Sequence, residues 1–397
     1  MVQISRRMSQ ISESQTLALS GLMARLKREG KDVVALGAGE PDFDTPQHIK
    51  EAAIAAIQKG FTKYTAAEGT AELREAICRW LLEEYQAEYK PSQIVVTCGA
   101  KHAVYQAILA VCNPGDEVLL PAPYWVSYPE QIKLAGATTK FMETNERSNL
   151  KISAAQLKDA ITSRTKLLIL NSPSNPSGAV YDARELSSLA EVIHDSGIMV
   201  LSDEIYDKIV FDDAQFASIA QFPEIRDQLL LVNGVSKTFA MTGWRIGFLA
   251  AHQDVANAVK NYQGHSTSNP TSISQSAALT AMLGQKQFIV DMRAAFTERR
   301  NYVHHRLCAM PDVRCLLPQG AFYAFPNISA YFGKRKGDRL IQSSVDLCGY
   351  LLQDFGVAIV PGSAFGMDSH ARLSFATSMA VLEKALDRIE NGLKSLL

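Results

Sequence analysis

Residues 229–251 read LLLVNGVSKTFAMTGWRIGFLAA, and this stretch shows how the middle of the chain is organised. Two apolar runs, Leu229–Asn233 and Ile246–Ala250, flank a more polar loop that contains Lys237. Short apolar runs bounded by turn residues are typical of strands that are buried on both faces. The stretch therefore predicts two core strands of a sheet, with a lysine in the loop that joins them.

Runs of the same kind precede this stretch, and helical patterns alternate with them. We expect four further strands at Ile94–Thr97, Glu117–Leu120, Lys166–Leu170 and Ile198–Ser202. Between them, Lys101–Cys112 and Arg184–Asp195 read as helices, the first of which ends at the stop signal Asn113-Pro114-Gly115. Buried strands that alternate with helices predict an α/β fold with a doubly wound, mainly parallel sheet.

The C-terminal part of the chain has a different pattern. Residues 288–310 and Ile341–Phe355 read as helices, Val357–Val360 as a strand, and the chain closes on an amphipathic helix around Val381–Leu393. This order favours a smaller α+β domain, and a length of 397 residues also suits two domains. We expect an N-terminal arm and part of the small domain at 1–47, a large domain at 48–292 and a small C-terminal domain at 293–397.

The composition is that of an ordinary globular protein, with a formal net charge of -1 and 20% charged residues. Without a basic run or a basic amphipathic helix, neither nucleic acid nor a membrane surface is an expected partner. The N-terminus lacks the apolar core of a signal peptide, and no apolar run is long enough to span a membrane. The six cysteines are scattered without metal-ligand spacing, which favours reduced thiols and no metal site. We expect a cytoplasmic protein.

Three polar loops follow three of the predicted strands, at the edge where open α/β sheets bind ligands. They contain the run Asn171–Gly178, the run Ser202–Tyr206 and Lys237. Asp203 directly follows an apolar strand, so its carboxylate needs a cationic or hydrogen-bonding partner. Each loop also has an ordinary structural explanation, as a turn, a helix N-cap or a surface lysine.

The surroundings of Lys237 alone favour a nucleophilic amine and a surface lysine about equally. The three loops together decide between these interpretations, because their groups suit one cofactor. Pyridoxal phosphate (PLP) requires an amine for a Schiff base and an acid beside its pyridine nitrogen. It also requires donors to its phenolic oxygen, and cations or N–H groups for its phosphate. The combination predicts a PLP site.

These segments resemble the class I aminotransferases of PLP fold type I, and closely the bacterial aspartate aminotransferases of subgroup I-gamma. The resemblance extends over almost the whole chain. Besides the three loops it rests on AGEPDFDTP (38–46), Tyr64 in TKY (62–64), PYWVSY (123–128) and ARLSFATS (371–378). Each segment alone is weak evidence, whereas all of them in this order are strong evidence.

The resemblance implies a role for each matching residue in holding PLP. Lys237 carries PLP as a Schiff base and then moves a proton during transamination. Asp203 pairs with the pyridine nitrogen, Tyr206 and Asn175 hydrogen-bond the phenolic oxygen, and Trp125 stacks on the ring. The phosphate is held by the start of a helix and by cationic or hydroxyl side chains, namely Gly99, Ala100, Lys101, Ser236, Arg245 and Tyr64.

The resemblance also implies a homodimer with shared active sites, since Tyr64 of one subunit reaches the phosphate in its neighbour. Arg372 then binds the α-carboxylate of the substrate as a bidentate fork. Asn175, Trp125 and the backbone at Gly39 complete the substrate contacts.

Two departures from the family pattern occur near the phosphate loop. Gly234 stands where many relatives have a serine, and residues 99–102 read GAKH without a hydroxyl. Lys101 matches the I-gamma residue that recognises the side-chain carboxylate of an acidic substrate. A lysine at a helix N-terminus opposes the helix dipole, which favours this role over a solvent-facing one. Thr16 matches a hydroxyl residue of relatives that use prephenate, although the neighbouring Lys-Pro-Ser of those relatives is replaced here.

The resulting hypothesis is a ping-pong transamination of L-aspartate and 2-oxoglutarate to oxaloacetate and L-glutamate. Alternatives are dual specificity for aspartate and prephenate, transamination of aromatic or other amino acids, and a PLP lyase or decarboxylase. A nicotinamide dehydrogenase is disfavoured because the third glycine is missing after Gly37 and Gly39. A regulator that binds PLP would need a DNA-binding domain, for which the N-terminal arm is too short.

Overall fold

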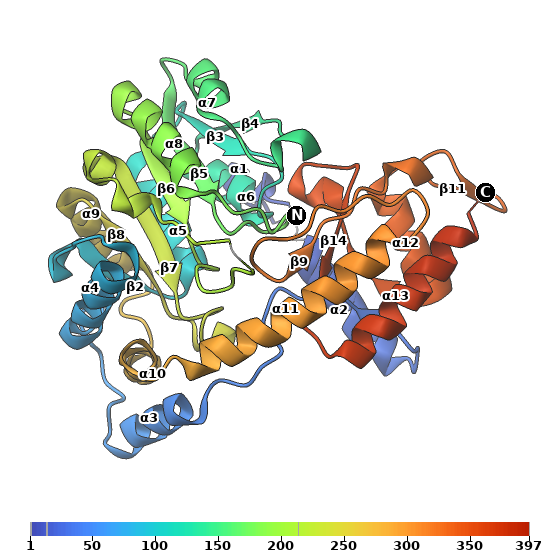
Figure 1. The fold of residues 1–397 in the computed structure, drawn as a ribbon. Coiled ribbons are helices and arrows are strands. Elements are labelled where there is room, and N and C mark those ends of the chain that lie inside the picture. The colour runs from blue at the N-terminus through green and yellow to red at the C-terminus, as the bar shows by residue number, and fades with distance from the viewer. Residues whose placement is uncertain (1, 13–14, 213, 397) are drawn as a thin grey trace.

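A seven-stranded sheet forms the centre of the larger part of the molecule (Figure 1). The computed structural model describes residues 2–12, 15–212 and 214–396, and for part of helix α2 it describes the backbone alone. The strands are β2 (Ile94–Thr97), β3 (Glu117–Pro121), β4 (Thr138–Met142), β5 (Thr165–Asn171), β6 (Met199–Asp203), β7 (Leu229–Gly234) and β8 (Gly247–Ala251). Their order is β2-β8-β7-β6-β5-β3-β4, and β8 alone runs in the direction opposite to the other six strands. The predicted doubly wound, mainly parallel sheet is confirmed.

Strand β4 was not predicted from the sequence. It lies at the edge of the sheet, where Thr138 and Phe141 are exposed and Met142 is buried. The exposed Thr138 and Phe141 and the polar Lys140 interrupt the apolar run by which the other strands were predicted, including β2 at the opposite edge.

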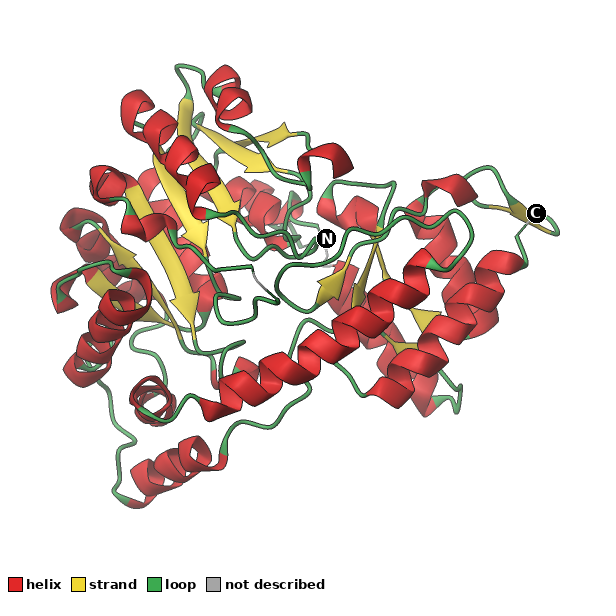
Figure 2. Cartoon of the chain, viewed as in Figure 1, coloured by secondary structure: helices red, strands yellow, loops and turns green. Residues whose placement is uncertain are grey.

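Helices cover both faces of the sheet, as Figure 2 shows. Ile94 and Val96 of β2 belong to the core on one face, and Val95 belongs to the core on the other. The first face packs against α3 (Gln47–Gln58), α4 (Ala71–Tyr85), α7 (Ala154–Ala160), α8 (Ala183–Ser196) and α10 (Ser272–Leu283). The second packs against α5 (Ala100–Val111), α6 (Ser127–Ala135) and α9 (Gln253–Ser266). Because both faces are covered, the central strands contain continuous apolar runs, with polar residues at their ends.

The smaller part combines elements from both ends of the chain (Figure 1). β1 (Val34–Ala35) pairs in parallel with β12 (Val357–Ala358), while β13 (Val360–Pro361), β14 (Ala371–Ser374) and β9 (Tyr323–Ala324) form an antiparallel sheet. Helices α12 (Ser344–Phe355) and α13 (Met379–Lys394) contribute to its core, α2 (Gln15–Arg28) lies beside β13, and β10 (Arg335–Lys336) with β11 (Arg339–Leu340) forms a short hairpin. The α+β character expected of this part is confirmed. The single strand expected at 357–360 is instead two short strands in different sheets.

The helix α11 (Gln287–Cys308) runs from one part to the other (Figure 1). Ile289 joins the core beside the large sheet, whereas Met292 and Phe296 join the core of the smaller part. The proposed domain boundary between residues 292 and 293 thus falls inside a continuous helix. The division into 1–47, 48–292 and 293–397 stays a proposal. Within the described residues, no helix combines the length and apolarity needed to cross a membrane.

Gly247, at the start of β8, allows a close approach between the sheet and α5. A Cβ atom at Gly247 would lie 2.2 Å from the backbone nitrogen of Ala100. Its antiparallel partner Gly234 is also crowded, because a Cβ there would lie 2.7 Å from the Cα of Gly247. The two glycines therefore let the start of α5 lie directly against the strands that flank the Lys237 loop.

We expect Gly247→Ala to lower the free energy of unfolding by about 1–3 kcal/mol, because backbone atoms must move to admit the methyl group. Gly264→Ala is the matched control, since Gly264 lies in α9 with open space around its Cβ position. The control should be neutral or stabilising by about 0.5–1 kcal/mol. Denaturant unfolding of both variants measures the difference, and equal stabilities would contradict the close approach.

Candidate active site

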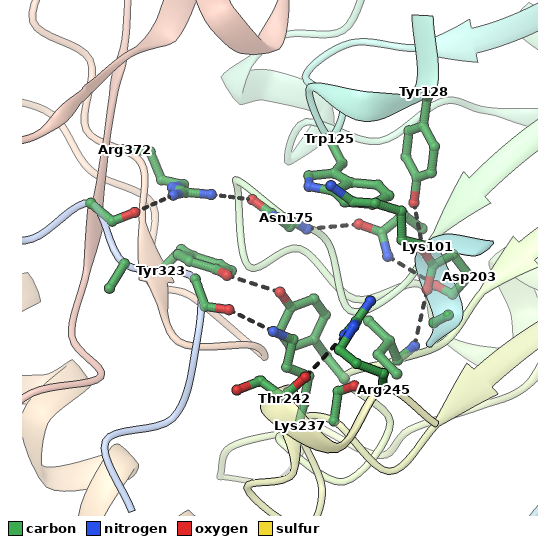
Figure 3. Close-up of a pocket in the computed structure, with 18 residues that line it drawn as sticks. Lys101, Trp125, Tyr128, Asn175, Asp203, Lys237, Thr242, Arg245, Tyr323 and Arg372 are labelled. Carbon is green, nitrogen blue, oxygen red and sulfur yellow. Dashed lines mark hydrogen bonds between the residues drawn. The ribbon is translucent and has the colours of Figure 1, made fainter. Parts of the chain in front are cut away.

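A cavity of about 360 Å³ lies where the carboxyl ends of β5, β6 and β7 face the smaller part (Figure 3). This volume is in the range of small-molecule sites. Eleven of the fourteen residues selected from the sequence line it: Gly39, Ala100, Lys101, Trp125, Asn175, Asp203, Tyr206, Ser236, Lys237, Arg245 and Arg372. The three polar loops therefore meet in one site, together with β14 and the start of α5.

Lys237 lies in the loop after β7, and its amine points into the cavity (Figure 3). Its Nζ donates a hydrogen bond to the backbone oxygen of Gly39 at 2.5 Å. Burial lowers the pKa of Lys237 to about 8, with Glu40 opposing this change and Arg245 adding to it. A lysine with this pKa is partly neutral near physiological pH, so its amine is nucleophilic.

Asp203 is the last residue of β6 and is 4% exposed. Its Oδ2 accepts a hydrogen bond from the hydroxyl of Tyr128 at 2.8 Å, and its Oδ1 accepts one from the Ile205 backbone at 3.2 Å. Burial raises the pKa of Asp203 to about 6, while the Tyr128 and Ile205 hydrogen bonds oppose the rise. A carboxylate in this position is stabilised by a cationic ligand group in the cavity.

The start of α5 and Arg245 form an anion-binding corner. Helix α5 begins after Gly99, whose φ is 86°, and a Cβ atom at Gly99 would lie 2.5 Å from Nη2 of Arg245. Arg245 also donates to the backbone oxygens of Thr242 at 3.0 Å and Cys98 at 3.3 Å. Backbone N–H groups at a helix N-terminus, a guanidinium and the nearby Ser236 together suit a phosphate group.

Arg372, on β14, lies on the opposite side of the cavity (Figure 3). It is 2% exposed, and it donates to Oδ1 of Asn175 at 2.9 Å and to the backbone oxygen of Gly37 at 2.8 Å. Its Nε has no hydrogen-bond partner among the described residues, and the side chains that affect its pKa are tyrosines, Tyr323 and Tyr206. A buried guanidinium with neutral partners favours an anionic ligand.

Lys101 places a further cation at the cavity, beside Trp125. Its Nζ lies 4.9 Å from the centre of the Trp125 ring (Figure 3). Partial burial lowers the pKa of Lys101, and the nearby Arg245 adds to this effect. The contact with the aromatic face favours a position of the ammonium group at the cavity, although Lys101 is exposed in the single chain.

Three of the residues selected from the sequence are not among the lining residues. Gly99 lies beneath Arg245, and Tyr64 is 89% exposed on the surface of the single chain. Thr16 belongs to α2, but its side chain lies outside the part of the structure that is described.

Two tyrosines contribute to the site without having been selected from the sequence. Tyr128 bonds Asp203, and the hydroxyl of Tyr323 lies 2.8 Å from that of Tyr206. Tyr128 belongs to the quoted segment 123–128, which could have indicated it. Tyr323 reaches the site only because β9 pairs with β14, a contact that no local sequence signal indicates.

The donor set of this cavity fits PLP. It combines a nucleophilic amine, a buried acid, three tyrosine hydroxyls and an anion-binding corner, with a buried arginine left over for a substrate carboxylate. The Nε of Arg372, which has no partner among the described residues, is a group that a bound substrate can satisfy.

The fold and the site define an enzyme that transfers amino groups with the help of PLP. Residues 31–389 match the family described as aminotransferase class I and II, and the chain belongs to this family. Enzymes of this family use PLP as their cofactor.

Within this family, the chain is similar to aspartate aminotransferases and to aspartate/prephenate aminotransferases. The chain is 44% identical to an aspartate aminotransferase of Geobacillus stearothermophilus, over 99% of this chain and 100% of that protein. It is also 44% identical to an aspartate/prephenate aminotransferase of Nitrosomonas europaea, over 98% and 99%. The crystal structure of the aspartate aminotransferase from Rhizobium meliloti matches with a TM-score of 0.97 at 42% identity and covers 100% of both chains.

The lowered pKa of Lys237, about 8, predicts the pH dependence with which its amine captures PLP. Only the neutral amine attacks the cofactor aldehyde, so the capture rate of the apoenzyme should rise as the pH passes through about 8 and level off above it. Rapid mixing with PLP, followed by visible absorbance, measures this rate. Lys237→Ala should show no capture, and a midpoint near the ordinary lysine value of 10.5 would contradict the effect of burial.

Proposed function

We propose that this protein transfers the amino group of L-aspartate to 2-oxoglutarate, with Lys237 as the PLP-binding lysine. The observation that carries the proposal is the pair of cations, Arg372 and Lys101, that line one cavity with Lys237. One cation suits the α-carboxylate and the other the side-chain carboxylate of a dicarboxylic amino acid. The names of the related aspartate aminotransferases support this substrate.

Bound PLP supplies an electron sink for the negative charge that develops at the substrate α-carbon. The buried Asp203 supports this chemistry by keeping a negative charge opposite the pyridine nitrogen. Tyr206 would hold the phenolic oxygen of PLP through its hydroxyl hydrogen. Asn175 would hold the same oxygen with its amide nitrogen, since its Oδ1 already accepts from Arg372.

Lys237 acts a second time, as the base and acid of the amino transfer. With PLP and substrate bound, Nζ of Lys237 would accept the proton from the substrate α-carbon and would later give a proton back. A pKa near 8 lets this amine accept and release protons at neutral pH. The oxygen of Gly39, 2.5 Å from Nζ, orients the amine within the cavity.

The substrate contacts follow from the charges of the cavity. Arg372 keeps its hydrogen bond to Asn175 Oδ1, and its remaining N–H groups, including the unpartnered Nε, bind the α-carboxylate. Lys101, held over Trp125, meets the second carboxylate. A substrate with an apolar side chain leaves this cation unpaired, which lowers its transition-state binding relative to aspartate.

We expect Lys101→Ser to lower kcat/KM for aspartate and glutamate by about 10-fold to 100-fold, the worth of one charged hydrogen bond. Turnover of alanine and phenylalanine should change much less. The matched control is Lys158→Ser, since Lys158 is exposed on α7. Steady-state rates with 2-oxoglutarate give the comparison, and prephenate as an acceptor tests dual specificity. Equal losses for acidic and neutral donors would contradict the role of Lys101.

A homodimer with shared active sites is part of the same proposal. Ile54, Ile57, Phe61 and Tyr64, in and after α3, are 51%, 54%, 39% and 89% exposed. Exposed apolar groups that cluster in one segment favour a protein interface. A second copy of this chain is the partner that the family resemblance implies, with Tyr64 reaching the phosphate of the neighbouring subunit.

Subunit mixing tests the shared site. Lys237→Ala and Tyr64→Ala dimers should each be weakly active at limiting PLP, but a hybrid of the two holds one site with both native residues. Because half of randomly mixed dimers are hybrids, the mixture should regain about a quarter of the wild-type activity. A mixture no more active than the average of its parents would contradict a site shared between subunits.

A cytoplasmic location also stays a proposal. The six cysteines, Cys78, Cys98, Cys112, Cys308, Cys315 and Cys348, are free thiols. Free thiols are typical of a reducing compartment, which supports this location.

A further inference from the structure

Two tyrosine hydroxyls meet at the cavity although they come from different parts of the molecule (Figure 3). Tyr206 follows β6 in the large part, and Tyr323 lies in β9 of the smaller part; their hydroxyl oxygens are 2.8 Å apart. Tyr206 is 4% exposed and Tyr323 is fully buried. A Cβ atom at Gly39 would lie 3.2 Å from the Tyr323 hydroxyl, so the backbone of residue 39 encloses this oxygen.

The proposed function, on which this inference rests, decides which hydroxyl donates. A tyrosine has one hydroxyl hydrogen. If Tyr206 gives that hydrogen to the phenolic oxygen of PLP, it can only accept from Tyr323. We propose that Tyr323 is a positioning residue, which donates a hydrogen bond to Tyr206 and thereby orients and polarises the hydroxyl that meets the phenolic oxygen.

Both hydroxyls keep their protons at neutral pH, so each of the two tyrosines can donate one hydrogen bond. Burial raises the pKa of Tyr206 and of Tyr323, although the neighbouring Arg372 opposes the rise. Consecutive hydrogen bonds in a buried site polarise each other and strengthen by roughly 10–30% per bond. Donation from Tyr323 therefore makes Tyr206 a stronger donor.

The charged groups around this pair come from several elements. The Arg372 guanidinium lies 4.4 Å from the centre of the Tyr323 ring, and Nζ of Lys237 lies 5.9 Å from the centre of the Tyr206 ring. The charge of Asp203 raises the pKa of Tyr206. The charge of Glu40 raises the pKa of Lys237, and that of Arg245 lowers it. A change of Tyr323 to phenylalanine leaves all of these groups in place and removes one oxygen atom.

Tyr323 lies in the small sheet between Arg372 and Tyr206 and contacts both side chains. Tyr323 pairs with Ser374 across the ladder between β9 and β14, two residues from Arg372 on the same strand. Arg372 lies against the Tyr323 ring while it binds Asn175. One side chain thus contacts both the arginine for the substrate carboxylate and the tyrosine for the cofactor oxygen.

The test is the pH titration of visible absorbance in the PLP-loaded enzyme, compared between wild type and Tyr323→Phe. Donation from Tyr206 withdraws negative charge from the phenolic oxygen and so weakens the hold on the proton that this oxygen shares with the Lys237 nitrogen. Without the Tyr323 hydroxyl, the hydrogen bond from Tyr206 to the phenolic oxygen weakens. We therefore expect the midpoint of the absorbance titration to move up by a few tenths of a pH unit. Tyr206→Phe should move it further in the same direction.

Two comparisons separate this role from a merely structural one. In the Tyr206→Phe background, Tyr323→Phe should add no further shift, because its effect passes through the Tyr206 hydroxyl. Tyr331→Phe is the matched control, since the hydroxyl of this buried tyrosine bonds the oxygen of Pro311 and Tyr331 is not a lining residue. The control should leave the midpoint unchanged, even if it lowers the melting temperature.

An unchanged midpoint in a folded, PLP-loaded Tyr323→Phe enzyme would overturn the inference, and so would an additive shift in the double variant. Neither result would affect the proposed function if wild type transaminates aspartate. By contrast, a wild-type protein that binds no PLP or transfers no amino group would overturn the proposed function itself. The two failures are therefore distinguishable.

Discussion

The register of three parallel strands is the constraint on which the site depends. Asn171 of β5 pairs with Asp203 of β6, and Asp203 pairs with Val232 of β7. Because parallel strands end at the same edge, their loops emerge side by side. A shift by one residue in β6 would turn the Asp203 side chain to the opposite face of the sheet. The distance between the buried acid and the Lys237 loop is thus set by backbone pairing in the core.

The cavity at the ends of these strands carries an excess of positive charge. Lys101, Lys237, Arg245 and Arg372 line the cavity together with one acid, Asp203. In a partly buried site, such a set strongly favours anions, which here means a phosphate and the carboxylates of a substrate. The cations lie on different sides of the cavity. Arg245 lies at the start of α5, where a phosphate would bind, and Arg372 comes from the smaller part, where a substrate carboxylate would bind.

Much of this arrangement could be predicted from local sequence patterns. The central strands are buried on both faces, so their apolar runs are visible, and the loop residues Asn175, Asp203 and Lys237 follow them directly. Strand β4 was missed because its exposed and polar residues interrupt the apolar pattern. Tyr323 was missed because its contact with Tyr206 joins residues 117 positions apart. Tyr64 acts in the proposed site only through a second chain, so the fold of one chain does not test it.

The partners of Arg372 have a consequence for the energetics of the whole enzyme. Folding transfers this guanidinium from water to a site where neutral oxygens and aromatic rings surround it. The unfolded chain solvates the same charge fully, so its burial without a counterion opposes folding. A bound carboxylate supplies the missing negative charge only in the folded state. Substrate binding and folding are therefore linked, so a bound dicarboxylic acid stabilises the folded protein.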